Sequence, residues 1–539
     1  MSERRPGPSL APRARARLRY AAGLRRFFGE RPGPERCDAA VAARHARRAE
    51  AMLDVFERGI YGNRRSPYRR LLTAAGIEFG DVVTLVDRSG VEATLSRLYE
   101  EGVRLSVDEF KGRVPIRRLG LEWRAQIDDF DNPLLQRHYE ARTGGSRGGG
   151  SRLAIDLDLL AYEAAYLSLC LRGFGLERMP FAAWRPLPPG LAGMKGMLRR
   201  AHLGLPIEAW FSQYRYRRRP QALKFALLTS ATIAASRRFG SPIPAPQHAP
   251  LERAPDIARW LAERARSGAA IHLDTNWSTA VRACLSAADQ GLDLSGTFFR
   301  VGGEPGTAAR KATIEAAGGR FASHYSMGEV GWIGIACPHR EALDEVHLLT
   351  DKLAVIQPPG ARSSPAERAL VLTTLLPSCP KILLNVDTGD HAVLGRRDCD
   401  CPAGSLGLDT TAHTIASHEK LTTEGMSFVG SEIAWLLEEA LPARFGGSVG
   451  DYQLVEERAP TLPRVTVVVD PSVPPSPDAE VIGTILSSLA SLGDGQRLMA
   501  EQWAQAETLR VARRKPYVAP GGKQGHLHVA DAGSQVHPA

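Results

Sequence analysis

Apolar residues in the middle of the chain occur in short runs that alternate with amphipathic stretches of helical spacing. The runs Ala270–Asp274, Gly296–Val301 and Arg320–His324 predict strands. Between them, Ser278–Gln290 and Thr307–Ala317 predict helices. Strands that alternate with helices of this length are typical of a largely parallel sheet. The pattern therefore predicts an α/β fold.

Both flanks of this segment carry further elements. On the N-terminal side, Ala39–Arg58 has the apolar spacing of an amphipathic helix, and residues 153–250 look mostly helical with proline-rich breaks. On the C-terminal side, Leu370–Leu375 and Ile382–Val386 are apolar runs of strand length. A helix, a strand and a second helix are expected after them, at Ser431–Leu441, Val465–Val469 and Ala479–Leu492.

Length and charge divide the chain into three parts. With 539 residues it is too long for one ordinary core. Residues 1–35 are rich in Arg, Pro and Gly, and we expect a basic, loosely ordered N-terminus. Residues 36–416 are expected to form a large N-terminal α/β domain with several subdomains. Residues 417–539 are expected to form a small, mobile α+β C-terminal domain, with the functional site between the two.

Composition argues against several classes of protein. No uninterrupted apolar stretch reaches about 18 residues, and the basic N-terminus lacks the apolar core of a secretory signal. We therefore expect a cytoplasmic protein with no membrane partner. Seven cysteines without regular spacing argue against a disulfide framework. The formal charge is +10, but no zinc-finger spacing or interleaved aromatics accompany the basic clusters, so a small anionic ligand is a simpler partner than nucleic acid.

A glycine-rich segment runs from Thr143 to Arg152. Glycines let the backbone approach a ligand closely, and successive N–H groups in such a loop can cradle phosphate oxygens. A flexible linker is the simpler alternative. It is not a Walker loop, because no Gly-Lys-Ser/Thr follows. Gly144–Gly148 also fits the Gly-x-Ser-x-Gly elbow of serine hydrolases, but its polar approach and the glycines after it do not suit the required strand–turn–helix.

Three further motifs follow predicted strands, where open α/β sheets bind their ligands. They are Val301-Gly302-Gly303-Glu304-Pro305, His324-Tyr325-Ser326-Met327-Gly328-Glu329 and Asp387-Thr388-Gly389-Asp390. Tyr325 and its small neighbours would pack against an adenine ring, and Glu329 would hold Mg²⁺. Asp390 would accept both hydroxyls of a ribose. Taken singly, each motif also suits an ordinary turn or a solvated loop.

In this order and spacing the four motifs resemble those of the adenylate-forming superfamily, and most closely its phenylacetate–CoA ligase branch. That branch has a Ser/Thr/Gly-rich phosphate loop, Gly-Gly-Glu-Pro, a Tyr-Gly-x-Thr-Glu type motif and Tyr-Arg-Thr-Gly-Asp. A small mobile domain with a catalytic lysine beside glycine follows. Ser66–Leu72 and Ala74–Ile77 also resemble this branch, and the resemblance covers about residues 60 to 530.

The resemblance implies roles for the motif residues. The ATP phosphates would contact Thr143, Gly144, Gly145, Ser146 and Gly148. The adenine pocket would be lined by Gly302, Gly303 and Glu304, beside Tyr325 and Ser326. Glu329 would bind Mg²⁺ and Asp390 the ribose. Lys523, in Gly521-Gly522-Lys523, would be the catalytic lysine at the reacting carboxylate and the α-phosphate.

The sequence departs from the family pattern in three places. The phosphate loop lacks the usual lysine, and Arg147 or Arg152 is its expected replacement. Gly328 stands where threonine is common. The hinge segment Ala416–Lys420 has no arginine, and Lys420 is near enough to substitute for it. These departures bear on transfer to coenzyme A more than on ATP binding.

A structural zinc site is expected from Cys337, His347, Cys399 and Cys401. Three thiolates and one imidazole are a suitable tetrahedral set for zinc, and a Cys-x-Cys loop is too short for comfortable disulfide geometry. Some proteins of the resembled branch have a similar Cys…His and Cys-x-Cys arrangement. His339 is a rival for the fourth position, and free cysteines are the alternative.

The resemblance implies an ATP- and Mg²⁺-dependent ligase that activates a carboxylic acid as an acyl adenylate and transfers it to coenzyme A. Two alternatives stay open: a CoA-independent ligase that uses an amine or hydroxyl acceptor, and a non-catalytic nucleotide-binding protein. The acid pocket is expected to include His272, Asn276 and Trp277. Trp277 favours an aromatic acid, although a core tryptophan is an equal alternative. The oligomeric state is open, a dimer included.

Overall fold

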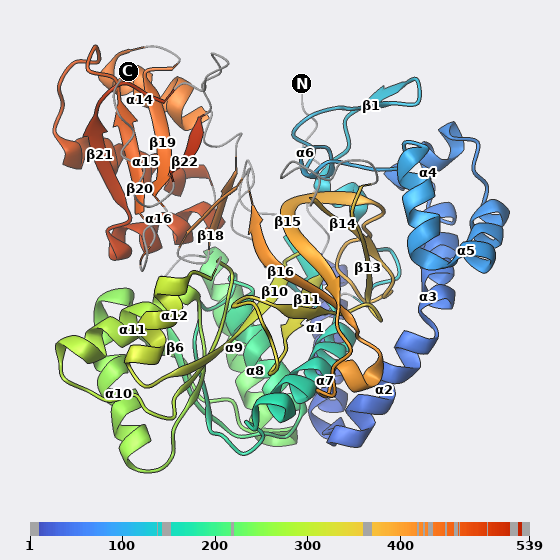
Figure 1. Ribbon diagram of the computed structural model, residues 1–539, viewed down its shortest axis with the longest axis horizontal. Coiled ribbons are helices and arrows are strands. Elements are labelled where there is room, and N and C mark those ends of the chain that lie inside the picture. Colours follow the sequence, from blue (N-terminus) through green and yellow to red (C-terminus); the bar gives the residue numbers. More distant parts are fainter. Residues whose placement is uncertain are drawn as a thin grey trace.

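The computed structural model describes residues 10–136, 138–142, 152–216, 220–304, 306–358, 369–417, 420–423, 426–429, 435–447, 450–457, 462, 464–492, 494–517 and 526–530. A twelve-stranded sheet forms its centre (Figure 1). Its strands follow the order β13 (Leu353–Ile356), β14 (Ala369–Thr374), β15 (Val386–Arg396), β16 (Thr410–Ser417), β12 (Val346–Leu348), β11 (Gly331–Ala336), β10 (Arg320–Met327), β9 (Phe298–Gly302), β8 (His272–Asp274), β5 (Phe181–Trp184), β6 (Ile207–Ser212) and β7 (Gln247–His248).

The sheet has a parallel half and an antiparallel half that meet at β10. Strand β10 is parallel to β9, and β8, β5, β6 and β7 continue this direction. On its other side β10 pairs antiparallel with β11, and antiparallel pairing continues to β13. The α/β prediction is confirmed for the parallel half.

Helices cover both faces of the parallel half (Figure 1). Alternate strand residues show which face is which: Leu273, Phe299 and Phe321 pack with α10 (Ala254–Arg266), α11 (Trp277–Asp289) and α12 (Ala308–Ala316). Phe298 and Ala322 point the other way and pack with α7 (Leu157–Phe174). On that second face α8 (Ala192–His202) packs beside α7.

The antiparallel half packs against helices from the N-terminal part of the chain in the largest core cluster. The helix expected at Ala39–Arg58 is divided, because the chain turns after residue 46 and changes to a π-helix at residue 55. The elements here are α2 (Pro34–Ala46), α3 (Arg48–Asp54), η1 (Val55–Tyr61), α4 (Pro67–Ala74), α5 (Phe79–Glu100) and α6 (Val107–Phe110). Smaller elements are β1 (Ile116–Arg118), β2 (Leu121–Trp123), η2 (Ile127–Phe130), η3 (Leu251–Arg253), η5 (Gly404–Leu406), β17 (Lys420–Thr423) and β18 (Met426–Val429).

The N-terminus differs from the prediction of a loosely ordered segment. Helix α1 spans Leu10–Glu30 and contacts α7, α8 and α9 (Pro220–Phe239). Tyr20, Leu24, Phe27 and Phe28 are buried in the core that these helices share. Their spacing places them on one side of the helix, which gives α1 an apolar face. The prediction of a loosely ordered segment was based on the high content of arginine instead. That prediction is therefore wrong for residues 10–30.

Residues 153–250 were expected to be mostly helical, and this is wrong for β5 and β6. Both strands lie inside the sheet, and Trp184 and Trp210 are fully buried. A strand covered on both faces has no polar–apolar alternation, so a short apolar run in it can be mistaken for part of a buried helix.

A small α+β unit follows the large sheet at the upper left of Figure 1. Its four-stranded sheet has the order β21 (Leu509–Arg513), β20 (Arg464–Val469), β19 (Tyr452–Glu457) and β22 (Leu527–Ala530). The helices are η6 (Leu436–Ala440), α14 (Leu441–Phe445), α15 (Asp478–Leu492) and α16 (Asp494–Ala506). Tyr214 donates a hydrogen bond to the Leu498 carbonyl of α16 at 2.7 Å, so α16 contacts the large unit. The boundary expected near residue 416 stays a prediction.

Among the described residues, no helix has both the length and the apolar character that crossing a membrane requires.

Candidate functional site

The carboxyl ends of three neighbouring parallel strands bring two of the sequence motifs together. Strand β8 ends at Asp274, and β9 beside it ends at Gly302. In β10, His324 lies opposite Gly302, and the Tyr325–Glu329 motif continues from there. The Gly-Gly-Glu turn and the Tyr325 motif therefore lie at one edge of the sheet, where open α/β sheets bind ligands.

Two glycines make the turn after β9 possible. A Cβ atom on Gly302 would lie only 2.6 Å from the His324 ring. Gly303 has a φ of +80°, a conformation that other residues rarely adopt. The backbone here passes closer to β10 than a side chain would allow.

Glu304 is buried in this turn, and its carboxylate is fully engaged. It accepts hydrogen bonds from the Ser278 hydroxyl at 2.7 Å and from the Ser278 N–H at 3.1 Å. Arg310 donates to it at 2.9 Å. The carboxylate therefore holds the start of α11 against the turn, and any contribution to an adenine pocket would come from the neighbouring backbone.

Tyr325 and Asp390 are joined although β10 and β15 are not neighbours in the sheet. The Tyr325 hydroxyl donates to Oδ2 of Asp390 at 2.7 Å. Burial and the Asp390 charge raise the pKa of Tyr325 well above its usual value, so the phenol stays a neutral donor. Residues 387–390 lie within the first part of β15, not in a loop after a strand as expected. Ser326 is exposed.

Glu329 is buried and forms an ion pair with Lys111, which follows α6. Burial alone would raise the pKa of Glu329, but the Lys111 ammonium outweighs it and the pKa is lowered. The Lys381 N–H donates to the Glu329 carbonyl at 3.1 Å. A buried carboxylate that stays ionised is a suitable ligand for a cation. Sequence reasoning missed Lys111, because nothing local in the sequence links it to a residue 218 positions away.

The expected phosphate loop lies outside the described residues, but its two flanks form a hairpin. Strand β3 (Tyr139–Arg142) pairs antiparallel with β4 (Arg152–Ile155), and Arg142 lies opposite Arg152. A serine-hydrolase elbow joins a strand to a helix, whereas both described flanks of this loop are strands. Arg152, one expected replacement for the loop lysine, donates to Glu140 at 3.1 Å.

Several predicted site residues cannot be placed. Outside the described residues lie Thr143, Gly144, Gly145, Ser146, Arg147, Gly148 and Lys523. The backbone of Lys420 begins β17, but its side chain lies outside the description. Their assigned roles stay predictions.

The four expected zinc ligands lie together. The sulfur atoms of Cys337, Cys399 and Cys401 and one ring nitrogen of His347 all lie within 4.8 Å of one another. The Cys337 and Cys399 sulfurs are 3.6 Å apart, and the Cys401 sulfur is 3.2 Å from Nε2 of His347. With zinc bonds of about 2.3 Å to sulfur and 2.0 Å to nitrogen, a tetrahedral site would need about 3.5–3.8 Å between ligand atoms. All four residues thus have the chemistry and the spacing of a closed zinc site.

The second ring nitrogen of His347 supports the same arrangement. Its Nδ1 lies 2.7 Å from the Leu408 carbonyl, which leaves Nε2 facing the three sulfurs. The rival His339 is exposed and lies near Cys399 and Asp400 instead. The cysteines are free thiols rather than disulfides.

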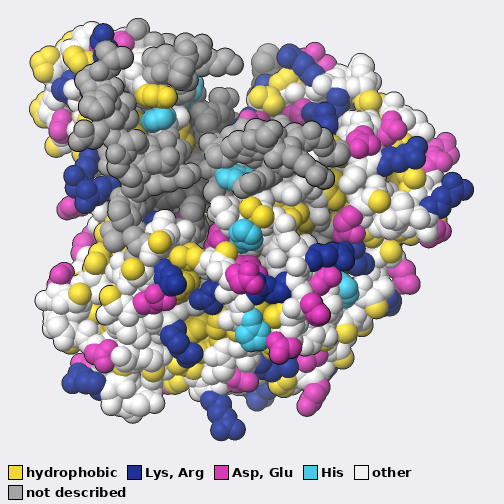
Figure 2. Space-filling model, viewed as in Figure 1, with side chains coloured by type: hydrophobic (Ala, Val, Ile, Leu, Met, Phe, Trp, Pro, Cys, Tyr) yellow, Lys and Arg dark blue, Asp and Glu magenta, His cyan; other side chains and the backbone are white. Residues whose placement is uncertain are grey.

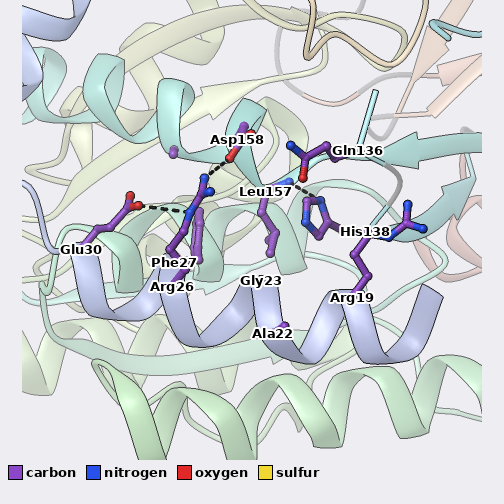
Figure 3. Close-up of a pocket in the computed structure, with 11 residues that line it drawn as sticks. Arg19, Ala22, Gly23, Arg26, Phe27, Glu30, Gln136, His138, Leu157 and Asp158 are labelled. Atoms are coloured by element: carbon purple, nitrogen blue, oxygen red, sulfur yellow. Dashed lines mark hydrogen bonds and ion pairs between the residues drawn. The ribbon is translucent and has the colours of Figure 1, made fainter. Parts of the chain in front are cut away.

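A separate groove of about 260 Å³ lies between α1 and α7 (Figure 3). Arg26, in its wall, pairs with Asp158 at 2.6 Å and with Glu30 at 3.3 Å. The Arg26 charge is therefore compensated within the groove.

Comparison with known proteins identifies the fold. No protein-family model and no curated protein matches the chain. The structure of a 2-hydroxyisobutyryl-CoA ligase in complex with 2-HIB-AMP and CoA is similar with a TM-score of 0.52, at 15% identity over 94% of this chain and 91% of that chain. The amide bond synthetase McbA from Marinactinospora thermotolerans gives a TM-score of 0.44, at 13% identity over 94% of this chain and 98% of that chain. The first similarity shows that this chain has the fold of that ligase. Its place in the phenylacetate–CoA ligase branch stays a prediction.

Proposed function

We propose that this chain uses ATP and Mg²⁺ to convert a carboxylic acid into an acyl adenylate and then transfers the acyl group to coenzyme A. The observation that carries the proposal is the meeting of the Gly302, Tyr325 and Asp390 motifs in a chain with the adenylate-forming fold. The 2-hydroxyisobutyryl-CoA ligase of that fold is known in complex with an acyl-AMP and CoA, which supports both half-reactions.

The proposed nucleotide site lies at this edge of the sheet. The backbone of Gly302 and Gly303 and the ring of Tyr325 would bind the adenine, and Asp390 would accept the ribose hydroxyls. The hairpin loop between β3 and β4, with Arg147, would hold the phosphates. Glu329 would hold Mg²⁺, whose charge would offset that of the phosphates.

The chemistry follows from charge. One oxygen of the substrate carboxylate attacks the α-phosphorus of ATP, the bond to the β-phosphate oxygen breaks, and pyrophosphate leaves. Negative charge accumulates on the α-phosphate during attack, so a preorganised cation there stabilises the transition state more than the ground state. We assign this role to Lys523, four residues before β22.

We also propose that Cys337, His347, Cys399 and Cys401 hold a structural zinc ion. It would join the segment after β11 to the loop after β15, and both of these strands carry or adjoin motif residues. With four protein ligands the site would be closed, as structural zinc sites are.

Two features bear on the ligand class. Trp277 is fully buried and packs against Phe321 in the core with α10 and α11, so it gives no support for an aromatic acid.

On the face that Figure 2 shows, Lys and Arg side chains are interspersed with Asp and Glu, which favours a small anionic ligand over nucleic acid.

Exchange of labelled pyrophosphate into ATP, with a panel of acids, tests the proposal. Exchange that depends on one acid supports adenylation, and a thioester formed after CoA is added supports the second half-reaction. Exchange without a thioester would favour the alternative acceptors, an amine or a hydroxyl. ATP binding without exchange for any acid would favour the non-catalytic alternative, and a protein that does not bind ATP would overturn the proposal.

A further inference from the structure

A layer of charged side chains is buried between the parallel half of the sheet and helices α7 and α8. Asp274 and Arg300 are register partners in β8 and β9. Their neighbours Leu273, Phe299 and Val301 point to the α10–α12 face, so Asp274 and Arg300 face α7 and α8. On the helix side, the layer contains Glu163 of α7 and three cations of α8.

The layer contains more cations than anions. Its six cations are Arg185, Lys195, Arg199, Arg200, Arg300 and Lys352, and each is at most 5% exposed. Its carboxylates are the fully buried Glu163 and Asp274. The nearby carboxylates Asp351 and Glu304 are already paired with Arg44 and Arg310. Charges in a protein interior are normally paired, because an unpaired charge loses its hydration without compensation.

Each carboxylate of the layer is shared. Asp274 pairs with Arg185 at 3.0 Å and also with Arg300. Glu163 pairs with Arg199 at 2.7 Å and with Lys352 at 3.7 Å. It also accepts the Trp332 N–H at 2.8 Å. Neither carboxylate therefore has much capacity for another cation.

Lys195 is the cation without a direct partner. Its side chain makes no hydrogen bond within the described part of the chain, although the residue is only 5% exposed. Burial lowers the pKa of Lys195 to about 8, with the Glu163 charge opposing the change, so the ammonium form still dominates at pH 7. An ammonium with three N–H donors and no acceptor among the described residues is suited to an anion.

Further donors in the same layer also have no partner. Nε and Nη1 of Arg300, Nε of Arg199 and Nδ1 of His324 lack an acceptor among the described residues. The guanidinium groups of Arg199 and Arg300 lie 4.4 Å and 4.9 Å from the centre of the Trp332 ring, and the His324 ring is 5.6 Å from it. These donors therefore gather around one aromatic side chain.

This layer adjoins the proposed adenylate site. The His324 ring lies against the Gly302 backbone, and Tyr325 is the next residue of β10. Helix α8 reaches the same edge, because a Cβ on its Gly196 would lie 3.2 Å from Oδ2 of Asp274. His272 and Asn276, expected in the acid pocket, belong to this region: Asn276 accepts from Arg185, and both ring nitrogens of His272 lack a partner among the described residues.

We propose that the acid activated by this chain is a dicarboxylate, whose second carboxylate binds Lys195 together with Arg199 and Arg300. The inference rests on the proposed function, because it assigns the end of the substrate that is not adenylated. A monocarboxylic acid would bring no charge to the layer, whereas a second carboxylate would supply the acceptors that these buried donors lack.

Matched acids test the inference by pyrophosphate exchange. Adipate and terephthalate are compared with their monoamides, which keep the shape but lose the second charge. We expect a diacid to be activated with a KM about 10–150-fold lower than that of its monoamide, the range for a hydrogen bond to a charged group. In Lys195→Gln that preference should shrink several-fold, because KM rises for the diacid, which keeps only Arg199 and Arg300, and stays unchanged for the monoamide.

Controls separate the outcomes. Lys224→Gln, on the exposed side of α9, should behave like the parent protein. Melting curves show whether Lys195→Gln is folded, and Lys195→Met is the second variant if it is not. Equal activation of acids and monoamides, or an equal loss for both in Lys195→Gln, would overturn the dicarboxylate assignment but leave adenylation standing. If no acid supports exchange, the proposed function fails, and calorimetric binding of the diacids to parent and Lys195→Gln still decides whether the layer binds a dianion.

Discussion

Asp390→Asn should weaken ATP binding while leaving the fold unchanged. One carboxylate oxygen of Asp390 accepts from Tyr325 at 2.7 Å, and in the proposed site the charged carboxylate also accepts from the ribose hydroxyls. Asparagine can still accept from Tyr325, but it replaces the other oxygen with an amide donor and removes the charge. A hydrogen bond to a charged group contributes about 1.5–3 kcal/mol, so the Kd for ATP should rise about 10–150-fold.

Tyr325→Phe tests whether the hydrogen bond orients the carboxylate. It removes a buried donor without changing the charge of Asp390, and we expect a smaller rise in Kd of about 2–10-fold. In the double variant the two effects should not add, because Tyr325 acts through Asp390. A double variant whose loss equals the product of the two single losses would contradict this coupling.

Isothermal titration calorimetry with ATP and Mg²⁺ measures these changes. Asp409→Asn is the matched control, because its side chain is 45% exposed and lies 3.6 Å from Arg396, away from the motifs. This control should bind ATP like the parent. An Asp390→Asn protein with a Kd within twofold of the parent would refute the ribose assignment and the placement of the nucleotide at this sheet edge.

Three further predictions concern metal, catalysis and pH. Protein purified without chelator should contain close to one equivalent of zinc. The zinc should be lost when Cys399 and Cys401 are both replaced by Ser and kept in His339→Ala. Metal retained by the double variant would disprove the site. Lys523→Ala should slow adenylation about 10²–10³-fold, as the loss of one transition-state donor does, with ATP affinity and melting temperature unchanged; near-parental turnover would assign the chemistry to another group. Burial would raise the pKa of Glu163, but the neighbouring cations outweigh burial and lower the pKa from 4.5 to about 2. The ionised Glu163 therefore stabilises the fold above pH 4.5, and this stabilisation is lost as pH falls towards 2. Glu163→Gln should therefore cost about 3–5 kcal/mol at pH 7 in urea unfolding, and a deficit that does not shrink between pH 4.5 and 3 would contradict this reasoning.

Short-range residue patterns were sufficient to predict several strands and helices. The predicted strand Gly296–Val301 corresponds to β9, and the predicted helix Ser278–Gln290 corresponds to α11 within two residues at either end. The fold shared with the acyl-CoA ligase could also be predicted, because the motifs that indicate it are glycine turns and strand ends formed by consecutive residues. The grouping of Cys337, His347, Cys399 and Cys401 could be predicted for a similar reason, since cysteine and histidine are few and chemically distinctive.

Residues whose roles depend on distant partners could not be predicted. Lys111 and Glu329 are joined only when α6 meets the end of β10, and no periodicity relates them. Strand β5 was missed because burial on both faces removes the alternation that identifies a strand.

The charged layer shows the same limit most clearly. Lys195 and Arg199 on α8 would be taken from the sequence as a solvated helix face, since charged residues at helical spacing usually are. Packing against the sheet removes these residues from water and brings Glu163 of α7 to Arg199. Sequence by itself determined which side chains are charged and which strands end in ligand-binding turns. Only the tertiary structure decided which charges share a low-dielectric interior, because burial and partnership belong to pairs of distant segments and not to either segment alone.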